Sequence, residues 1–97
     1  MKSKAVNDLA AEVEAKTLNL IDVREADEFA SGHLPGAINL PLSDFLERYG
    51  ELDKDKSYHI ICRSGARSAQ ACAFLEEEGY DVTNVAGGTI AWMGDLE

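Results

Sequence analysis

The stretch SYHIICRSGARSAQACAFLEEEG, residues 57–79, decides the fold that this sequence predicts. Its first five residues, SYHII, form a run of strand length, and residues 66–79 carry apolar side chains at helical spacing and end on a glycine. Between them, a short loop begins at Cys62 and runs into the first turn of the helix. A strand that passes through a short loop into a helix is half of a βαβ unit, which indicates an α/β fold.

The rest of the chain continues this alternation of strands and helices. The expected strands cover residues 18–23, 37–40, 57–61 and 81–85, with a weaker candidate at 4–6. The expected helices cover residues 5–16, 43–49, 66–79 and a short segment after Gly87, with one or two helical turns at 25–30 and Ser43 as the N-terminal cap of the second helix. Such alternation predicts a central parallel sheet of four to five strands with helices on both faces.

Length and charge limit what this protein can be. Its 97 residues suffice for a single domain with one modest core, spanning residues 1–97, in which Leu96 and Glu97 are either native or the remnant of a cloning tag. The net charge of −9 repels nucleic-acid phosphates and anionic membranes, so we expect neither as a partner. No apolar run approaches the ~20 residues of a membrane helix, and the N-terminal segment lacks the apolar core of an export signal. We therefore expect a cytoplasmic protein.

The two cysteines differ in their expected surroundings. Cys62 ends a strand, whereas Cys72 shares the inner face of the following helix with Ser68, Ala71 and Leu75. Two cysteines without a CxxC pair form no disulfide framework, and with the two histidines they show no zinc-ligand spacing, so we expect no metal.

The loop after Cys62 has the composition of an anion-binding site. Ligands bind parallel sheets at the carboxyl ends of strands, where helices begin, and Cys62 falls at such a point. Gly65 allows the backbone to curl so that amide N–H groups face inward, and Arg63 and Arg67 add two positive charges. These surroundings are expected to lower the pKa of the thiol and to dock an anionic substrate beside it.

The alternative is that Cys62 is a buried small hydrophobic residue, which is the commoner role of a cysteine at a strand end. Burying this loop as part of a core would leave the two guanidinium groups of Arg63 and Arg67 without solvent. The sequence therefore favours a nucleophile.

Four motifs, taken together, resemble the rhodanese domains, the sulfurtransferase family. They are IDVRE at 21–25, GHLPGAINLP at 32–41, CRSGARS at 62–68, and GG followed by AW between 87 and 92. The resemblance extends from about Leu18 to Trp92 and implies a central parallel sheet. It also implies that Cys62 is the catalytic cysteine and carries a persulfide between two half-reactions.

The resemblance implies roles for further residues and for the substrates. The loop residues Arg63, Ser64, Gly65, Ala66, Arg67 and Ser68 would bind substrate, and Asp22, Arg24 and Trp92 would support the site, with Trp92 either at the pocket rim or in the core. The implied donor is a small anionic sulfur compound such as thiosulfate. The implied acceptor is cyanide or a thiol, including that of a thioredoxin-like or sulfur-relay protein. No metal or organic cofactor is implied.

Two other functions remain open at this stage. Four residues separate Cys62 from Arg67, whereas the phosphatases and arsenate reductases that resemble rhodaneses have one residue more. The shorter loop suits a sulfur atom better than a tetrahedral phosphate, so phosphate chemistry is the weaker hypothesis. The other is a non-catalytic regulatory module, or a carrier that accepts sulfur only from a protein donor.

Overall fold

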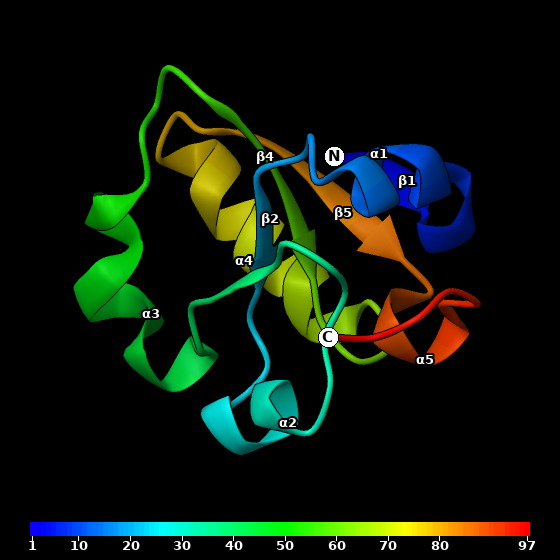
Figure 1. Ribbon diagram of the computed structural model, residues 1–97. Helices are drawn as coiled ribbons and strands as arrows, with labels where there is room; N and C mark the ends of the chain where they lie inside the picture. Colours follow the sequence, from blue (N-terminus) through cyan, green and yellow to red (C-terminus); the bar gives the residue numbers. More distant parts are fainter.

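A five-stranded parallel sheet organises the chain in the computed structural model, which describes residues 1–97 (Figure 1). The strands are β1 (Lys2–Ala5), β2 (Leu20–Asp22), β3 (Ile38–Asn39), β4 (Ser57–Ile61) and β5 (Asp81–Ala86). They lie in the spatial order β1-β5-β4-β2-β3, and every neighbouring pair is parallel. The expected α/β fold is confirmed, and β4, the strand that leads to Cys62, occupies the centre of the sheet.

The weak strand expected at residues 4–6 is present, but it covers Lys2–Ala5. All four of its residues are exposed, and it pairs only with β5 at the edge of the sheet. A strand without a buried face leaves no apolar alternation to recognise, and its two lysines are typical of a protected edge.

Helices cover both faces of the sheet. They are α1 (Ala10–Ala15), α2 (Ala26–Ala30), α3 (Leu42–Arg48), α4 (Ala66–Glu77) and α5 (Gly88–Ala91), with 3-10 turns at Val6–Leu9 and Tyr49–Glu51. The helix expected over residues 5–16 is therefore divided into a 3-10 turn and α1. The longest helix has 12 residues, and the helices include no apolar segment of the length that a bilayer crossing requires.

The expected Ser43 cap is wrong. Helix α3 begins one residue earlier, at Leu42, because Pro41 already has the extended backbone of a capping residue. The Leu42 amide donates to the carbonyl of Val23, and the Ser43 hydroxyl donates to the carboxylate of Glu25 at 2.6 Å. Contacts with the segment after β2 thus take the place of a local serine cap.

The core forms two clusters, one on each side of the sheet. Strand β4 contributes to both, because Ile60 packs with α3 and α4 while its neighbour Ile61 packs with α1 and the segment after α5. Cys62, two residues after Ile60, lies on the same face of the sheet as Ile60 and therefore points toward α4.

Strands β2 and β5 flank β4, so the segments that follow these three strands meet at one edge of the sheet. The segment after β5 lies directly on the loop after β4, since the amides of Thr89 and Ile90 donate to the carbonyls of Cys62 and Arg63, each at 3.0 Å. Gly88 makes this approach possible. It has φ +63°, and an added Cβ would collide with the same two carbonyl oxygens.

We predict that Gly88→Ala destabilises the fold by roughly 2 kcal/mol, because it combines a left-handed backbone with a backbone collision. Urea unfolding followed by circular dichroism measures this change. The matched control is Gly50→Ala, since Gly50 has no atom within 4 Å of the position that a Cβ would occupy. The control is expected to stay within about 1 kcal/mol of the unmodified protein. Equal losses in the two variants would contradict the predicted contact.

Candidate active site

The sulfur of Cys62 sits inside a curled loop at the start of α4. The Gly65 amide donates to Sγ at 3.0 Å, and the Ser68 hydroxyl lies 3.3 Å from the same atom. Gly65 has φ +108°, which turns the chain inward immediately before the helix begins at Ala66. The predicted cradle of inward-facing amide groups is therefore present.

Burial and hydrogen bonding act in opposite directions on the Cys62 thiol. Burial raises its pKa, but hydrogen bonds from the Ser68 hydroxyl and from the amides of Ser68, Gly65 and Ser64 outweigh burial, so the pKa lies below its ordinary value. Cys72 lacks such donors, and burial raises its pKa to about 12. The fold thus activates one of the two free cysteines and keeps the other a neutral core residue.

The expectation that two guanidinium groups activate the thiol needs correction. Arg67 donates two hydrogen bonds to the carboxylate of Glu28 on α2, at 2.7 and 2.9 Å, so most of its charge is balanced there. Arg63 is exposed and forms no ion pair. Hydrogen bonds within the loop, rather than direct contacts with arginine, lower the pKa of Cys62.

The loop that activates the sulfur also covers it. Cys62 and Ser68 have no exposed surface, whereas Arg63, Ser64 and Ala66 are exposed. The loop residues thus form the wall between the sulfur and solvent.

The segment after β2 supports the site through a buried ion pair. Nε and Nη2 of Arg24 donate to the carboxylate of Asp22 at 2.8 to 3.1 Å, and Nη2 also donates to the carbonyl of Gly32 at 2.7 Å. Both charged residues are buried. Their mutual pairing provides the partners that buried charges require, and it ties the turn near Gly32 to the edge of the sheet.

The sequence left open whether Trp92 lies at the pocket rim or in the core, and the structure places it in the core. Its side chain is 9% exposed and packs in the cluster on the α1 side of the sheet, and its indole N–H donates to the carbonyl of Asp95. It does not line the cavity described next.

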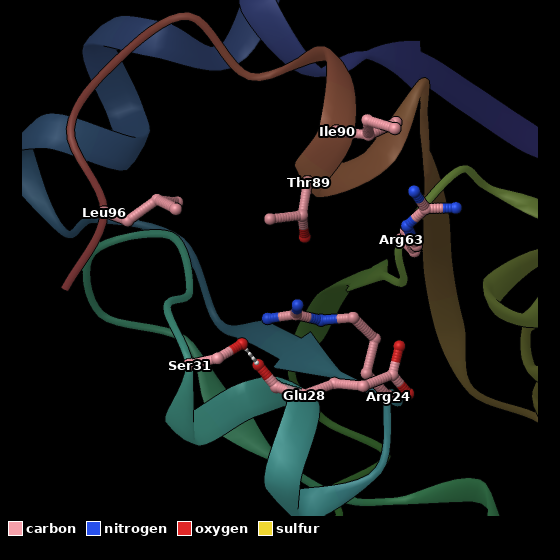
Figure 2. A pocket seen from close by; sticks show the side chains of 7 residues that line it. All are labelled: Arg24, Glu28, Ser31, Arg63, Thr89, Ile90 and Leu96. Atoms are coloured by element: carbon pink, nitrogen blue, oxygen red, sulfur yellow. Dashed lines mark hydrogen bonds between the residues drawn. The ribbon is translucent and has the colours of Figure 1, made fainter.

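A cavity of about 350 Å³ lies beside the Cys62 loop (Figure 2). It is lined by Arg24, Glu28, Ser31, Arg63, Thr89, Ile90 and Leu96. Of these, only Arg24 and Arg63 were among the site residues expected from the sequence. The others come from α2 and the residue that follows it, from α5 and from the C-terminal segment, which the fold brings to the same edge of the sheet.

Sequence reasoning missed Glu28 and Asn84. The side-chain oxygen of Asn84, on β5, lies 2.6 Å from the Ser68 hydroxyl, so that it shares the one hydroxyl hydrogen with Cys62 Sγ, and the Asn84 amide donates to the carbonyl of Gly65 at 3.3 Å. The sequence does contain a signal for Asn84, because strand alternation places this polar residue on the same face as buried Val82. No local pattern links Glu28 with Arg67, which lies 39 residues away.

Comparison with known proteins agrees with this geometry. The sequence model of the rhodanese-like domain matches residues 5–95. The chain belongs to this family. The crystal structure of a rhodanese-like domain protein from Staphylococcus aureus has 37% sequence identity and a TM-score of 0.89, and the match covers 100% of this chain and 97% of that one. The resemblance stated from the four motifs is thereby confirmed.

Several curated relatives of this rhodanese-like domain have names that refer to sulfur chemistry. The putative sulfurtransferase YtwF of Bacillus subtilis is 47% identical over 90 residues, which are 92% of this chain and 87% of that protein. The thiosulfate sulfurtransferase GlpE of Shewanella oneidensis is 35% identical, over 94% and 91% of the two chains. The putative sulfur carrier protein YrkF of Bacillus subtilis is 37% identical, over 84% of this chain and 45% of that protein.

We predict that Ser68→Ala raises the pKa of Cys62, because the variant loses a hydroxyl donor near the thiolate. The thiolate fraction at neutral pH should fall severalfold. Thiolate absorbance followed against pH measures this, and Cys72 does not interfere because its pKa is about 12. Ser3→Ala, which removes an exposed hydroxyl on β1, should leave the titration unchanged. An unaltered Cys62 titration in Ser68→Ala would contradict the assignment.

The Glu28–Arg67 ion pair should stabilise the protein in a pH-dependent way. The Arg67 hydrogen bonds lower the pKa of Glu28 from 4.5 to about 2. Because the folded-state pKa is lowered, the contribution is complete above the unfolded-state value and is lost as the pH falls toward 2.

We therefore predict that Glu28→Gln lowers the free energy of unfolding by on the order of 1 kcal/mol near neutral pH, since the pair is partly exposed. This difference from the unmodified protein should shrink as the pH is lowered below about 5, as measured by urea unfolding at several pH values. Glu14→Gln, an exposed change on α1, should show no such trend. A Glu28→Gln difference that is independent of pH would show that the ion pair is not its cause.

Proposed function

We propose that this protein is a rhodanese-type sulfurtransferase that moves sulfane sulfur through a persulfide on Cys62. One observation carries the proposal, namely that Sγ lies in a ring of hydrogen-bond donors that lowers its pKa. Two relatives named sulfurtransferases, which align with most of this chain, support the same reaction class.

In the first half-reaction, the Cys62 thiolate attacks the outer sulfur of an anionic donor such as thiosulfate. A bond forms between Sγ and that sulfur, and the sulfur–sulfur bond of the donor breaks, so that sulfite leaves with the bonding electron pair. The terminal sulfur of the new persulfide carries the negative charge. The amides of the loop are suited to hold such a charge, because they already face inward toward Sγ.

In the second half-reaction, a thiolate or cyanide attacks the terminal sulfur, and the electron pair of the broken bond returns to Sγ. The products are a new persulfide or thiocyanate and the starting Cys62 thiolate. Neither half-reaction requires a redox partner, because each transfers one neutral sulfur atom from one nucleophile to another.

Loop size favours sulfur over phosphate as the transferred group. Four residues separate Cys62 from Arg67, and the guanidinium group of Arg67 points to Glu28 instead of into the cradle. The transferred phosphoryl group of a phosphatase would need that positive charge.

We predict that incubation with thiosulfate adds one sulfur atom to the intact protein, as measured by mass spectrometry. Cys62→Ser should abolish the gain, whereas Cys72→Ser should retain it because burial keeps Cys72 protonated. A gain that persists in Cys62→Ser would refute the assignment of the nucleophile. No gain in the unmodified protein would argue against thiosulfate as a donor.

A carrier that takes sulfur only from a protein donor is the second candidate. The complete burial of Cys62 would suit a protein donor that displaces the loop as it docks. One relative is also named as a putative sulfur carrier. Comparing the turnover with thiosulfate and with a persulfidated protein, such as a cysteine desulfurase, separates the two functions. Transfer from the protein alone would select the carrier.

A further inference from the structure

The hydroxyl group of Ser68 has one hydrogen and three acceptors within reach. Its oxygen lies 2.6 Å from the side-chain oxygen of Asn84, 3.2 Å from the carbonyl oxygen of Gly65 and 3.3 Å from Sγ of Cys62. Ser68 has no exposed surface, so solvent does not compete for this hydrogen. Because a hydroxyl group carries a single hydrogen, the strongest of the three acceptors receives it.

The carbonyl of Gly65 is the weakest competitor because it is already in use. It accepts the amide of Ala69 at 3.1 Å, in the first turn of α4, and the side-chain amide of Asn84 at 3.3 Å. A carbonyl oxygen has two lone pairs, and these two donors occupy both. The choice of the Ser68 hydroxyl is therefore between Asn84 and the sulfur of Cys62.

The same carbonyl also fixes which end of the Asn84 side chain faces Ser68. A carbonyl only accepts hydrogen bonds, so the atom of Asn84 beside Gly65 is the NH₂ group and the atom beside Ser68 is the oxygen. A reversed amide would set two oxygen atoms against each other. Asn84 thus presents an acceptor, and not a donor, to the hydroxyl group.

The charge on the sulfur decides between these two acceptors. A neutral sulfur is a weak acceptor, whereas a hydrogen bond to an ionised acceptor is roughly twice as strong as one between neutral groups. The hydrogen is thus expected on the short contact to Asn84 while Sγ is neutral, and on Sγ once the thiolate forms. Sγ is neutral again in the persulfide, where the negative charge lies on the terminal sulfur.

We infer that Asn84 is a positioning residue that holds the hydroxyl hydrogen of Ser68 while Sγ is neutral and releases it to Sγ when the thiolate forms. The inference deepens the proposed function, because persulfide formation turns an anionic Sγ into a neutral one. The hydrogen that leaves Sγ in this step has Asn84 as its other acceptor, so no buried hydroxyl group loses its partner. Competition from Asn84 also keeps the thiolate less stable, and hence more nucleophilic, than an undivided hydroxyl group would make it.

Asn84→Leu tests this competition, because leucine resembles asparagine in shape and accepts no hydrogen bond. The Ser68 hydroxyl would then serve Sγ alone, so the pKa of Cys62 should fall further. The thiolate fraction measured by absorbance below that pKa should rise roughly threefold. If Asn84 served only to hold the loop in place, the amides would lose their direction toward Sγ and the thiolate fraction would fall. An unchanged or lower fraction would overturn the inference.

The same substitution in a protein that already carries Ser68→Ala separates the two roles further. Asn84 acts through the hydroxyl group, so Asn84→Leu should leave the thiolate fraction unchanged when that group is absent. An equal rise in both backgrounds would contradict the inference. The matched control is Asn19→Leu, which removes an exposed asparagine whose amide donates to the carbonyl of Ser57 at 3.1 Å. It should leave the titration unchanged in both backgrounds.

The charged groups around the loop stay the same in all of these variants. They are Arg67 with its partner Glu28 on α2, Asp22 with its partner Arg24 after β2, and the exposed Arg63. Helix α5, on the other side of the loop, carries no charged residue. A difference between the titrations therefore reports the hydroxyl group and not a changed ion pair.

NMR of the unmodified protein tests the exchange without any change at Asn84, in case Asn84→Leu does not fold. The side-chain carbonyl carbon of Asn84 should shift with the same midpoint as the Cys62 titration, because it loses the Ser68 hydrogen bond, and should shift back in the persulfide. Ser68→Ala should reduce this pH-dependent shift severalfold. A shift of the same size in Ser68→Ala would overturn the inference.

Failure of the proposed function has a different signature. The titrations of the free thiol would still follow the expected pattern, but neither thiosulfate nor a persulfidated protein would add sulfur to Cys62.

Discussion

The site depends on one backbone constraint, the left-handed turn at Gly65 that points amide groups at the sulfur of Cys62 just before α4 begins. Burial alone makes a thiolate unfavourable, and Cys72, with a pKa of about 12, shows the result when no donors compensate. Cys62 is equally buried and has a lowered pKa. The difference between the two thiols therefore comes from the direction of a few N–H and O–H groups, which the loop backbone sets.

Neighbouring strands hold this loop in place from both sides. On the β5 side, Asn84 contacts Ser68 and Gly65, and the segment at Gly88 packs on the carbonyl groups of the loop. On the β2 side, Glu28 binds Arg67. Because β4 lies between β2 and β5 in the sheet, each restraint reaches the loop over a short distance.

Paired charges explain how so many ionic groups fit into one region. Buried or partly buried charges are costly unless a partner with good geometry is present. The Asp22–Arg24 and Glu28–Arg67 pairs both meet this requirement through several hydrogen bonds. Pairing also decides which charges remain available, because it occupies Arg67 and leaves Arg63 and one nitrogen of Arg24 facing the cavity.

The sequence by itself determined the α/β fold with its parallel sheet and the inner face of α4, and it singled out the loop after Cys62 as the candidate site. These features depend on local periodicity and on which residue types follow a strand, so they are readable along the chain. The edge strand β1 was weakly marked because it has no buried face, and the Ser43 cap was wrong because Pro41 and Glu25 take over its role. Only the tertiary structure decided that Glu28 holds Arg67, that Asn84 contacts Ser68, that Trp92 lies in the core and that the loop seals Cys62 from solvent. Each of these depends on contacts between segments far apart in the chain, and such contacts leave no periodic signal in the sequence.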